Sequence, residues 1–192
     1  MPSLGGCRLI IAIGGKHGTG KSTCAKALAE SYGLRYISAG ETFRRIARER
    51  GISIKELSKF SEKDPSIDRI VDERTREEAE KDDVVLEGQL APWLAKDALK
   101  IYVTAPTKER ILRISRRDSL GYEEAERETL MREASEKKRY EEYYGINVDD
   151  LSIYDLIIDT GLFSKEETVK ILKEVINTTL KLSSKGKVQW RP

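Results

Sequence analysis

The 192-residue sequence is poor in residue types that mark several classes of protein. Its two cysteines, Cys7 and Cys24, fit neither a disulfide framework nor a metal-binding spacing, so we expect a reducing compartment. No apolar run approaches the roughly 20 residues of a membrane span. The short apolar run at residues 9–13 leads directly into glycines, which does not fit a signal peptide. We therefore expect a soluble, cytoplasmic protein that does not interact with membranes.

The chain also carries almost no net charge. The chain has 35 basic and 33 acidic residues, a formal charge of +2, which argues against a protein that coats nucleic acid. Amide side chains are rare: the sequence contains only Asn147, Asn177, Gln89 and Gln189. Together with a charged fraction of 35%, this scarcity is typical of heat-adapted proteins.

The pattern of apolar runs predicts an α/β fold. Five short strands are expected at residues 8–13, 34–37, 84–86, 100–103 and 154–158. Because helical segments separate them, the strands should form one parallel sheet with crossover helices on both faces, a three-layer α/β/α arrangement. The helical, charged stretches 40–81 and 115–145 should lie over the carboxyl edge of that sheet, where ligands of such folds bind. We expect one domain over residues 1–182 and a loose tail at 183–192.

A phosphate-binding motif connects the first predicted strand to the first predicted helix. Residues 15–22 read Gly-Lys-His-Gly-Thr-Gly-Lys-Ser and match G-x-x-x-x-G-K-[ST] in the context that the motif requires. Glycines let backbone N–H groups turn toward a phosphate, Lys21 would reach the β- and γ-phosphates of ATP, and Ser22 would bind Mg²⁺. His17, the only histidine, is expected to fill the loop rather than act as a base. The predicted ATP-binding residues are Gly15, Lys16, His17, Gly18, Thr19, Gly20, Lys21, Ser22 and Thr23.

A metal-binding acid is expected at the end of the third strand. Glu87 directly follows the apolar residues 84–86, which would place its carboxylate at the same edge as the phosphate loop. With Ser22 it forms the predicted Mg²⁺ site. Asp155 and Asp159, near the fifth strand, are the weaker candidates.

Arginines gather on the segments around the predicted cleft. Arg113 and Arg117 are four residues apart and share a helix face, with Arg110 close by. Arg132 and Arg139 share a face of the next helix. Two phosphorylated substrates that face each other would need this many cations. The cations would neutralise the phosphates of both substrates and the charge that spreads over the phosphoryl group during transfer. The alternative is a set of surface salt bridges in a heat-adapted protein.

These blocks resemble a known family, the short archaeal type of cytidylate kinase within the nucleoside monophosphate kinases. The similarity extends to about residue 180. It rests on residues 15–23, 34–40 with Phe43 and Arg44, 64–68 with Asp72, 85–88, 135–140, and 144–147 followed by 149–155. The last two blocks are distinctive.

The resemblance implies Mg²⁺-dependent, direct in-line transfer of the γ-phosphoryl group of ATP to CMP or dCMP. It also implies a P-loop core with a monophosphate-binding insert near residues 40–75 and a small lid near 115–122. With the phosphate motif, the resemblance gives Lys21, Arg113, Arg117 and Arg132 as the residues expected to act in transfer. The residues expected to contact CMP are Ser38, Arg44, Asp68, Gln89, Arg110, Arg132, Glu136 and Arg139, of which the resemblance itself carries over Ser38, Arg44, Arg132, Glu136 and Arg139.

One position departs from the family pattern. The family commonly has arginine directly after the Glu-Gly pair, where this chain has Gln89. An amide cannot neutralise phosphate, but it can pair with the amine and ring N3 of cytosine. Other acceptors, UMP or AMP, stay open, as does a slow regulatory ATPase, although the N-K-x-D motif of guanine-nucleotide switches is absent. We expect a monomer with nucleotides as its only partners.

Overall fold

The computed structural model describes residues 8–81 and 83–183. Its centre is one parallel sheet of five strands in the order β2-β3-β1-β4-β5. The strands are β1 (Ile10–Gly14), β2 (Arg35–Ser38), β3 (Val84–Glu87), β4 (Leu99–Thr104) and β5 (Leu156–Asp159). Because all five run in one direction, their carboxyl ends lie along a single edge, and this edge carries the phosphate motif.

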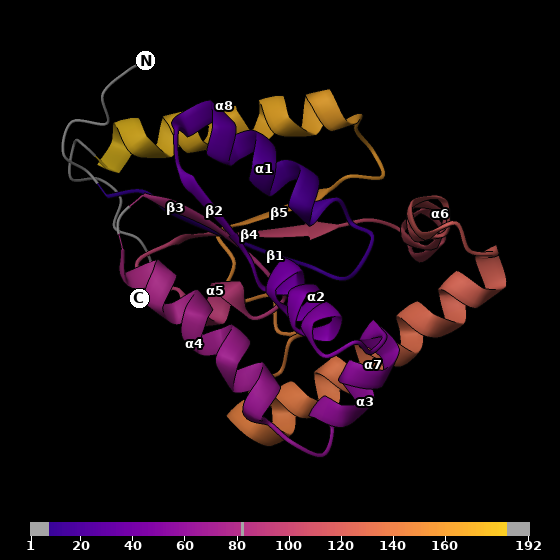
Figure 1. The fold of residues 1–192 in the computed structure, drawn as a ribbon. Coiled ribbons are helices and arrows are strands. Elements are labelled where there is room, and N and C mark those ends of the chain that lie inside the picture. Colours follow the sequence, from indigo (N-terminus) through magenta and orange to yellow (C-terminus); the bar gives the residue numbers. More distant parts are fainter. Residues whose placement is uncertain (1–7, 82, 184–192) are drawn as a thin grey trace.

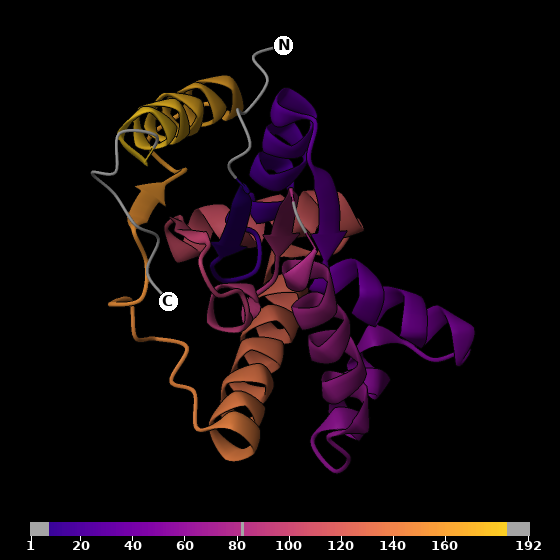
Figure 2. The same cartoon turned by 90° about the vertical axis from the view of Figure 1, so that its left-hand side faces the viewer.

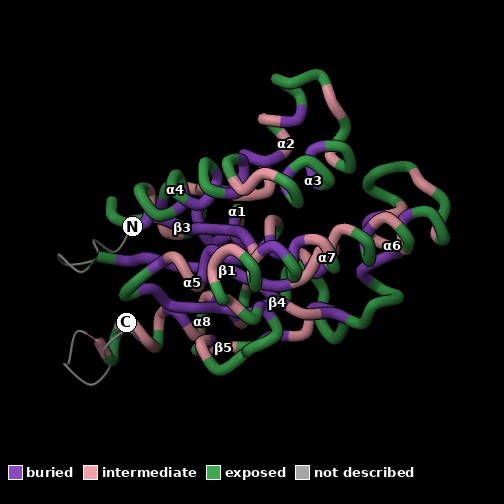
Figure 3. Tube along the Cα trace, turned by 90° about the horizontal axis from the view of Figure 1, so that it is seen from below, coloured by how far each residue is buried: buried purple, intermediate pink, exposed green. Residues whose placement is uncertain are grey.

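Two layers of helices cover the sheet, as Figures 1 and 2 show. Alternate residues of β1 point to opposite faces. Ile11 and Ile13 pack with α1 (Lys21–Tyr32) and α8 (Lys165–Ser183), whereas Ile10 and Ala12 pack beside α4 (Ser66–Glu80) and α5 (Ala91–Leu94). The three inner strands β1, β3 and β4 are therefore buried on both faces (Figure 3), which explains why they read as apolar runs, whereas the edge strands β2 and β5 are partly exposed.

The segment between β2 and β3 has a small apolar core of its own. It contains α2 (Ala39–Glu49), α3 (Ile54–Ser61) and α4, packed around Phe43, Leu57 and Ile67. Each of the first two helices begins with a serine cap: Ser38 accepts from the backbone of Glu41, and Ser53 forms a capping box with Glu56. The segment can thus hold its shape beside the sheet edge.

Two further helices complete the cleft. Helix α6 (Thr107–Asp118) has Ser119 as its C-cap. It packs against the long helix α7 (Tyr122–Tyr144), with Ile111, Ile114 and Ala125 buried between them. Helix α7 also packs against α3, so it spans from the lid-like turn at residues 119–121 to the segment after β2.

The α/β fold predicted from the sequence is confirmed. The first helix has the predicted bounds, and β5 begins two residues later than expected because Tyr154 turns away from the strand and packs edge-on against Tyr102. Residues 184–192 of the predicted tail lie outside the described part of the chain. Within the described part, no helix is both long and apolar enough to span a membrane.

Burial predicts how much α8 contributes to stability. Leu172 on α8 is fully buried against the sheet, so Leu172→Ala should lower the free energy of unfolding by about 2–5 kcal/mol. Leu162 is 75% exposed, and Leu162→Ala is the matched control, with an expected change within about 0.5 kcal/mol. Urea unfolding measures both. Equal losses in the two variants would contradict the assignment of α8 to the core.

Candidate active site

The phosphate loop lies between β1 and α1 and has a backbone that only glycine permits at two points. Gly15 has φ +138°, and a Cβ there would stand 2.1 Å from the carbonyl oxygen of Val103. Gly18 has φ +76°, and its Cβ would stand 2.5 Å from the carbonyl oxygen of Arg110. Neither position can accept a side chain. The glycines therefore let the loop touch the ends of β4 and α6 directly.

Short polar contacts fix the rest of the loop. Thr19 Oγ1 and Lys21 Nζ both donate to the carbonyl of Lys16, at 2.9 and 2.7 Å. Thr160, just after β5, donates from Oγ1 to the carbonyl of Thr19 at 2.8 Å. Burial lowers the pKa of Lys21, with Glu87 and Glu136 opposing the shift. The Lys21 ammonium thus lies inside the loop.

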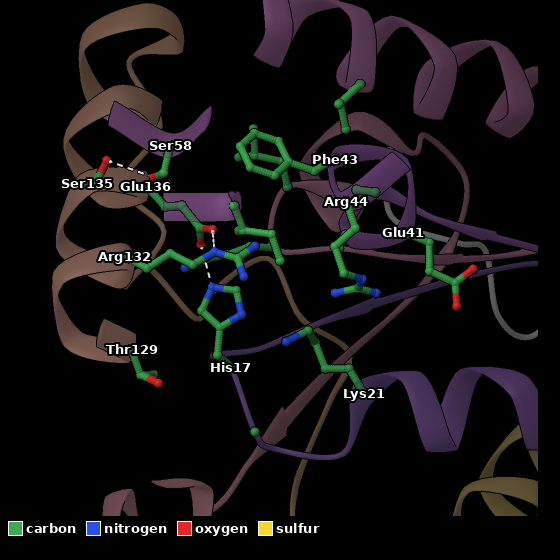
Figure 4. Close-up of a pocket in the computed structure, with 18 of the residues that line it drawn as sticks. His17, Lys21, Glu41, Phe43, Arg44, Ser58, Thr129, Arg132, Ser135 and Glu136 are labelled. Atoms are coloured by element: carbon green, nitrogen blue, oxygen red, sulfur yellow. Dashed lines mark hydrogen bonds and ion pairs between the residues drawn. The ribbon is translucent and has the colours of Figure 1, made fainter. Parts of the chain in front are cut away.

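His17 connects the loop to α7 (Figure 4). Its Nε2 lies 2.9 Å from Glu136 Oε2, and its backbone N–H donates to Glu133 Oε1 at 3.0 Å. Burial lowers the pKa of His17, so the neutral imidazole donates its Nε2 proton to the Glu136 carboxylate at neutral pH. Sequence reasoning had given His17 no such contact.

Arg110 lies behind the loop. Its guanidinium donates to the carbonyl of His17 at 2.8 Å and to Glu133 Oε1 at 2.6 Å, and the side chain is buried. It does not line the cavity described below, although it was expected to contact the acceptor. Its observed contacts are those of a residue that positions the loop.

Glu87 is held at the end of β3 by its neighbours on β2. Ser38 Oγ and Tyr36 Oη both donate to Glu87 Oε2, because β2 pairs with β3 and places Ser38 opposite Glu87. Both bonds use Oε2, which leaves Oε1 for another ligand. The two weaker metal candidates are engaged elsewhere: Asp155 accepts from the Lys100 N–H and Asp159 from the Gly161 N–H.

Arg113 and Arg117, two of the four arginines of α6, have different surroundings. Arg113 donates to both oxygens of Thr160, each at 2.8 Å, and so connects α6 to the residue that holds the phosphate loop. Arg117 makes a two-point ion pair with Asp118 at the lid-like turn and is largely exposed. Both side chains line the cavity.

On the opposite side of the cavity, Arg44 and Arg132 point inward. Arg132 pairs with Glu136 at 2.9 Å and lies over the ring of Phe43. His17 and Arg132 lower the pKa of Glu136 although its burial acts in the opposite direction, so that carboxyl stays ionised. Arg44, by contrast, has no ion pair or hydrogen bond with any described residue, and Figure 4 shows its guanidinium extending into the same cavity as Lys21.

Arg139 forms a buried junction of three helices. Its Nε donates to Asp68 Oδ2 at 2.7 Å and its NH1 to Ser135 Oγ at 2.6 Å, with Ser58 at 3.4 Å. Only 1% of the residue is exposed. Breaking such a pair leaves an uncompensated buried charge, so this contact fixes α3 and α4 against α7.

One cavity of about 1330 Å³ collects most of the predicted residues. It extends from the phosphate loop to the segment after β2. The predicted residues that line it are Gly15, His17, Gly18, Gly20, Lys21, Ser22, Thr23, Arg44, Asp68, Glu87, Gln89, Arg113, Arg117, Arg132, Glu136 and Arg139. Lys16, Thr19, Ser38 and Arg110 are not among the lining residues.

Gln89 follows β3 and lines the cavity, and its Oε1 is buried with no hydrogen-bond partner among the described residues. Buried polar atoms are rarely left unpaired, which makes this oxygen a candidate for a ligand contact. Sequence reasoning did not select Thr160 or Glu133, because their partners are distant in the chain.

The site combines a phosphate loop on a parallel sheet, an acid at the end of the neighbouring strand β3, and a second group of cations across the cavity. These features define the class of P-loop phosphotransferases. Comparison with known proteins identifies the family within this class. The cytidylate kinase-like family matches residues 10–162, and the chain belongs to that family.

Named relatives agree with this assignment. The cytidylate kinase of Staphylothermus marinus is 50% identical over 175 residues, covering 90% of this chain and 99% of the relative. The cytidylate kinase of Desulfurococcus amylolyticus is 48% identical, covering 89% and 94%. The amide-poor composition that indicates heat adaptation fits these archaeal relatives. Shikimate kinase from Bacteroides thetaiotaomicron is 17% identical with a TM-score of 0.59, covering 89% of this chain and 99% of that one; this likeness shows the fold alone.

The contact between His17 and Glu136 can be measured by a double-mutant cycle. Because the bond involves a charged acceptor, the cycle of His17→Ala with Glu136→Ala should give a coupling free energy of about 1.5–3 kcal/mol in urea unfolding. Glu133 contacts His17 only through the backbone N–H, which His17→Ala keeps, so the control cycle of His17→Ala with Glu133→Ala should give less than about 0.5 kcal/mol. Similar coupling in both cycles would show that the side-chain bond is not the cause.

Proposed function

We propose that this protein transfers the γ-phosphoryl group of ATP to CMP, and to its deoxy form dCMP, in a single in-line step. The observation that carries the proposal is one cavity with the phosphate loop on one side and the inward-pointing Arg44 and Arg132 on the other. At about 1330 Å³ it exceeds the roughly 300–1000 Å³ of a pocket for one small ligand, so two nucleotides fit.

Each group of cations has a place in this reaction. Lys21 and the loop N–H groups bind the donor phosphates, and Arg44, with no partner in the described structure, is free to bind the acceptor phosphate. Arg113, Arg117 and Arg132 neutralise the charge of the transferring group from the sides. Such transfer requires positioning and electrostatic stabilisation rather than a general base.

Mg²⁺ is the proposed cofactor, held by Ser22 and Glu87. Oxygen ligands suit this ion, which usually keeps several waters and binds few protein groups in addition to phosphates. A hydroxyl and a carboxylate that line the same cavity fit that requirement. When bound, the ion would neutralise charge on the β- and γ-phosphates.

The acceptor base is assigned to the pocket near Gln89. Its unpaired Oε1 can accept from the amine of cytosine while its NH₂ donates to ring N3. In this proposal residues 40–75 form the monophosphate-binding insert and residues 115–122 the lid, and the protein acts as a monomer in the cytoplasm.

The first test is a coupled assay with ATP and Mg²⁺ across the common monophosphates. We expect turnover with CMP and dCMP, slower turnover with AMP and UMP, and almost none without an acceptor. Lys21→Ala should lower kcat by about 10²–10³-fold, since it removes a charge that stabilises the transferring group. Fast ATP hydrolysis without an acceptor would contradict the kinase assignment, and equal rates with AMP and CMP would contradict the acceptor.

A second test concerns the family's arginine. Gln89→Arg should raise KM for CMP by about tenfold, because it replaces a base-pairing amide by a cation, while KM for ATP should change little. Gln89→Glu is the matched control because it keeps the side-chain shape and one acceptor oxygen. An unchanged KM for CMP in both variants would remove Gln89 from the base site.

A further inference from the structure

A second buried acceptor lies in the wall of the same cavity. Asp72 on α4 is 7% exposed, lines the cavity and has an Oδ2 with no hydrogen-bond partner among the described residues. Asp68 lies one turn earlier on the same face of α4, but its carboxylate is paired with Arg139. An unpaired buried carboxylate oxygen is costly, so it points to a ligand group that donates to it.

The groups around Asp72 come from two helices. Burial raises the pKa of Asp72 to about 7, Asp68 adds to the shift, and Tyr144, Arg76 and Arg139 oppose it. The Tyr144 hydroxyl acts on the pKa of Asp72 as a hydrogen-bond donor, yet neither this hydroxyl nor Asp72 Oδ2 has a partner of normal distance and angle among the described residues. Both protonation states of Asp72 are therefore populated near neutral pH.

The chemistry of the two pyrimidines gives this acid a function. The 4-position of cytosine carries an amine, which donates, whereas the 4-position of uracil carries an oxygen, which only accepts. We propose that the Asp72 carboxylate accepts a hydrogen bond from the amine of cytosine and so excludes uracil. This inference rests on the proposed function and adds the residue that selects the base.

Gln89 cannot make this selection alone. Turning its amide by half a rotation exchanges the acceptor oxygen for the NH₂ donor, so it can pair with either pyrimidine. An ionised Asp72 has no donor to offer uracil. Asp72 and Gln89 line the same cavity, and α4, which carries Asp72, packs against α5, which begins two residues after Gln89.

The charge on Asp72 also makes the selection depend on pH. A neutral carboxyl donates, and can therefore bind the uracil oxygen, so a proton on Asp72 should weaken the preference for CMP. Because the pKa is raised, the carboxylate predominates only above about pH 7, and the preference should rise with pH through that value. The phosphates of CMP and UMP titrate alike, so their effects cancel in the ratio.

The experiment compares kcat/KM for CMP and UMP in the native protein, in Asp72→Asn and in Glu73→Gln. Asp72→Asn adds an NH₂ donor at nearly constant shape, so the CMP:UMP ratio should fall by about 10–100-fold. Glu73, the exposed neighbour on α4, is the control, and its variant should keep the native ratio. Between about pH 6 and pH 8 the native ratio should rise, and the ratio in Asp72→Asn should stay flat.

Two results would overturn the inference: a native ratio that does not change with pH, or an unchanged ratio in a folded Asp72→Asn protein. Far-UV circular dichroism and melting establish that the variant is folded. Calorimetric binding of CMP and UMP to the same proteins gives the ratio independently of turnover. If no monophosphate were phosphorylated but the binding ratio still changed as expected, the proposed function would fail and the assignment of Asp72 would stand.

Discussion

The shape of the phosphate loop depends on close contact between its backbone and two other segments. At Gly15 and Gly18 the loop meets carbonyl groups at the end of β4 and in α6 so closely that no Cβ would fit. The loop therefore cannot move without those elements. Thr160 adds a third attachment, since its hydroxyl contacts the Thr19 carbonyl and also receives Arg113. The position of the phosphate loop is thus determined by β4, α6 and the segment after β5 together.

The acceptor side depends on a different kind of contact. The buried pair of Arg139 with Asp68 joins α7 to α4, although these residues lie 71 positions apart. A buried ion pair is weak evidence for stability, but it is selective, because any other docking of the helices would leave both charges unpaired. Together with the His17–Glu136 bond, this ion pair connects α7 both to the phosphate loop and to α4.

The sequence was most informative where function requires a local pattern. The motif at residues 15–22 predicted the loop and the bounds of α1, because both depend on neighbours in the chain. The arginines were harder to assign. Arg110 and Arg113 belong to one helix and look equivalent in sequence, yet one lies behind the loop with Glu133 and the other lines the cavity. Their partners come from helices and loops whose docking no local pattern encodes.

Fold and substrate are carried by different parts of the molecule. The fold is shared with a shikimate kinase at only 17% identity, and a fold by itself does not determine the acceptor. Selection must come from what faces the loop across the cavity, namely the segment between β2 and β3 and the helix α7. There Arg44, which has no ion pair or hydrogen bond within residues 8–81 and 83–183, suits a phosphate, and the oxygens of Asp72 and Gln89 that have no partner in the same residues suit a base that donates hydrogen bonds. A neutral alcohol substrate would leave these groups unsatisfied, whereas a cytidine monophosphate satisfies both kinds.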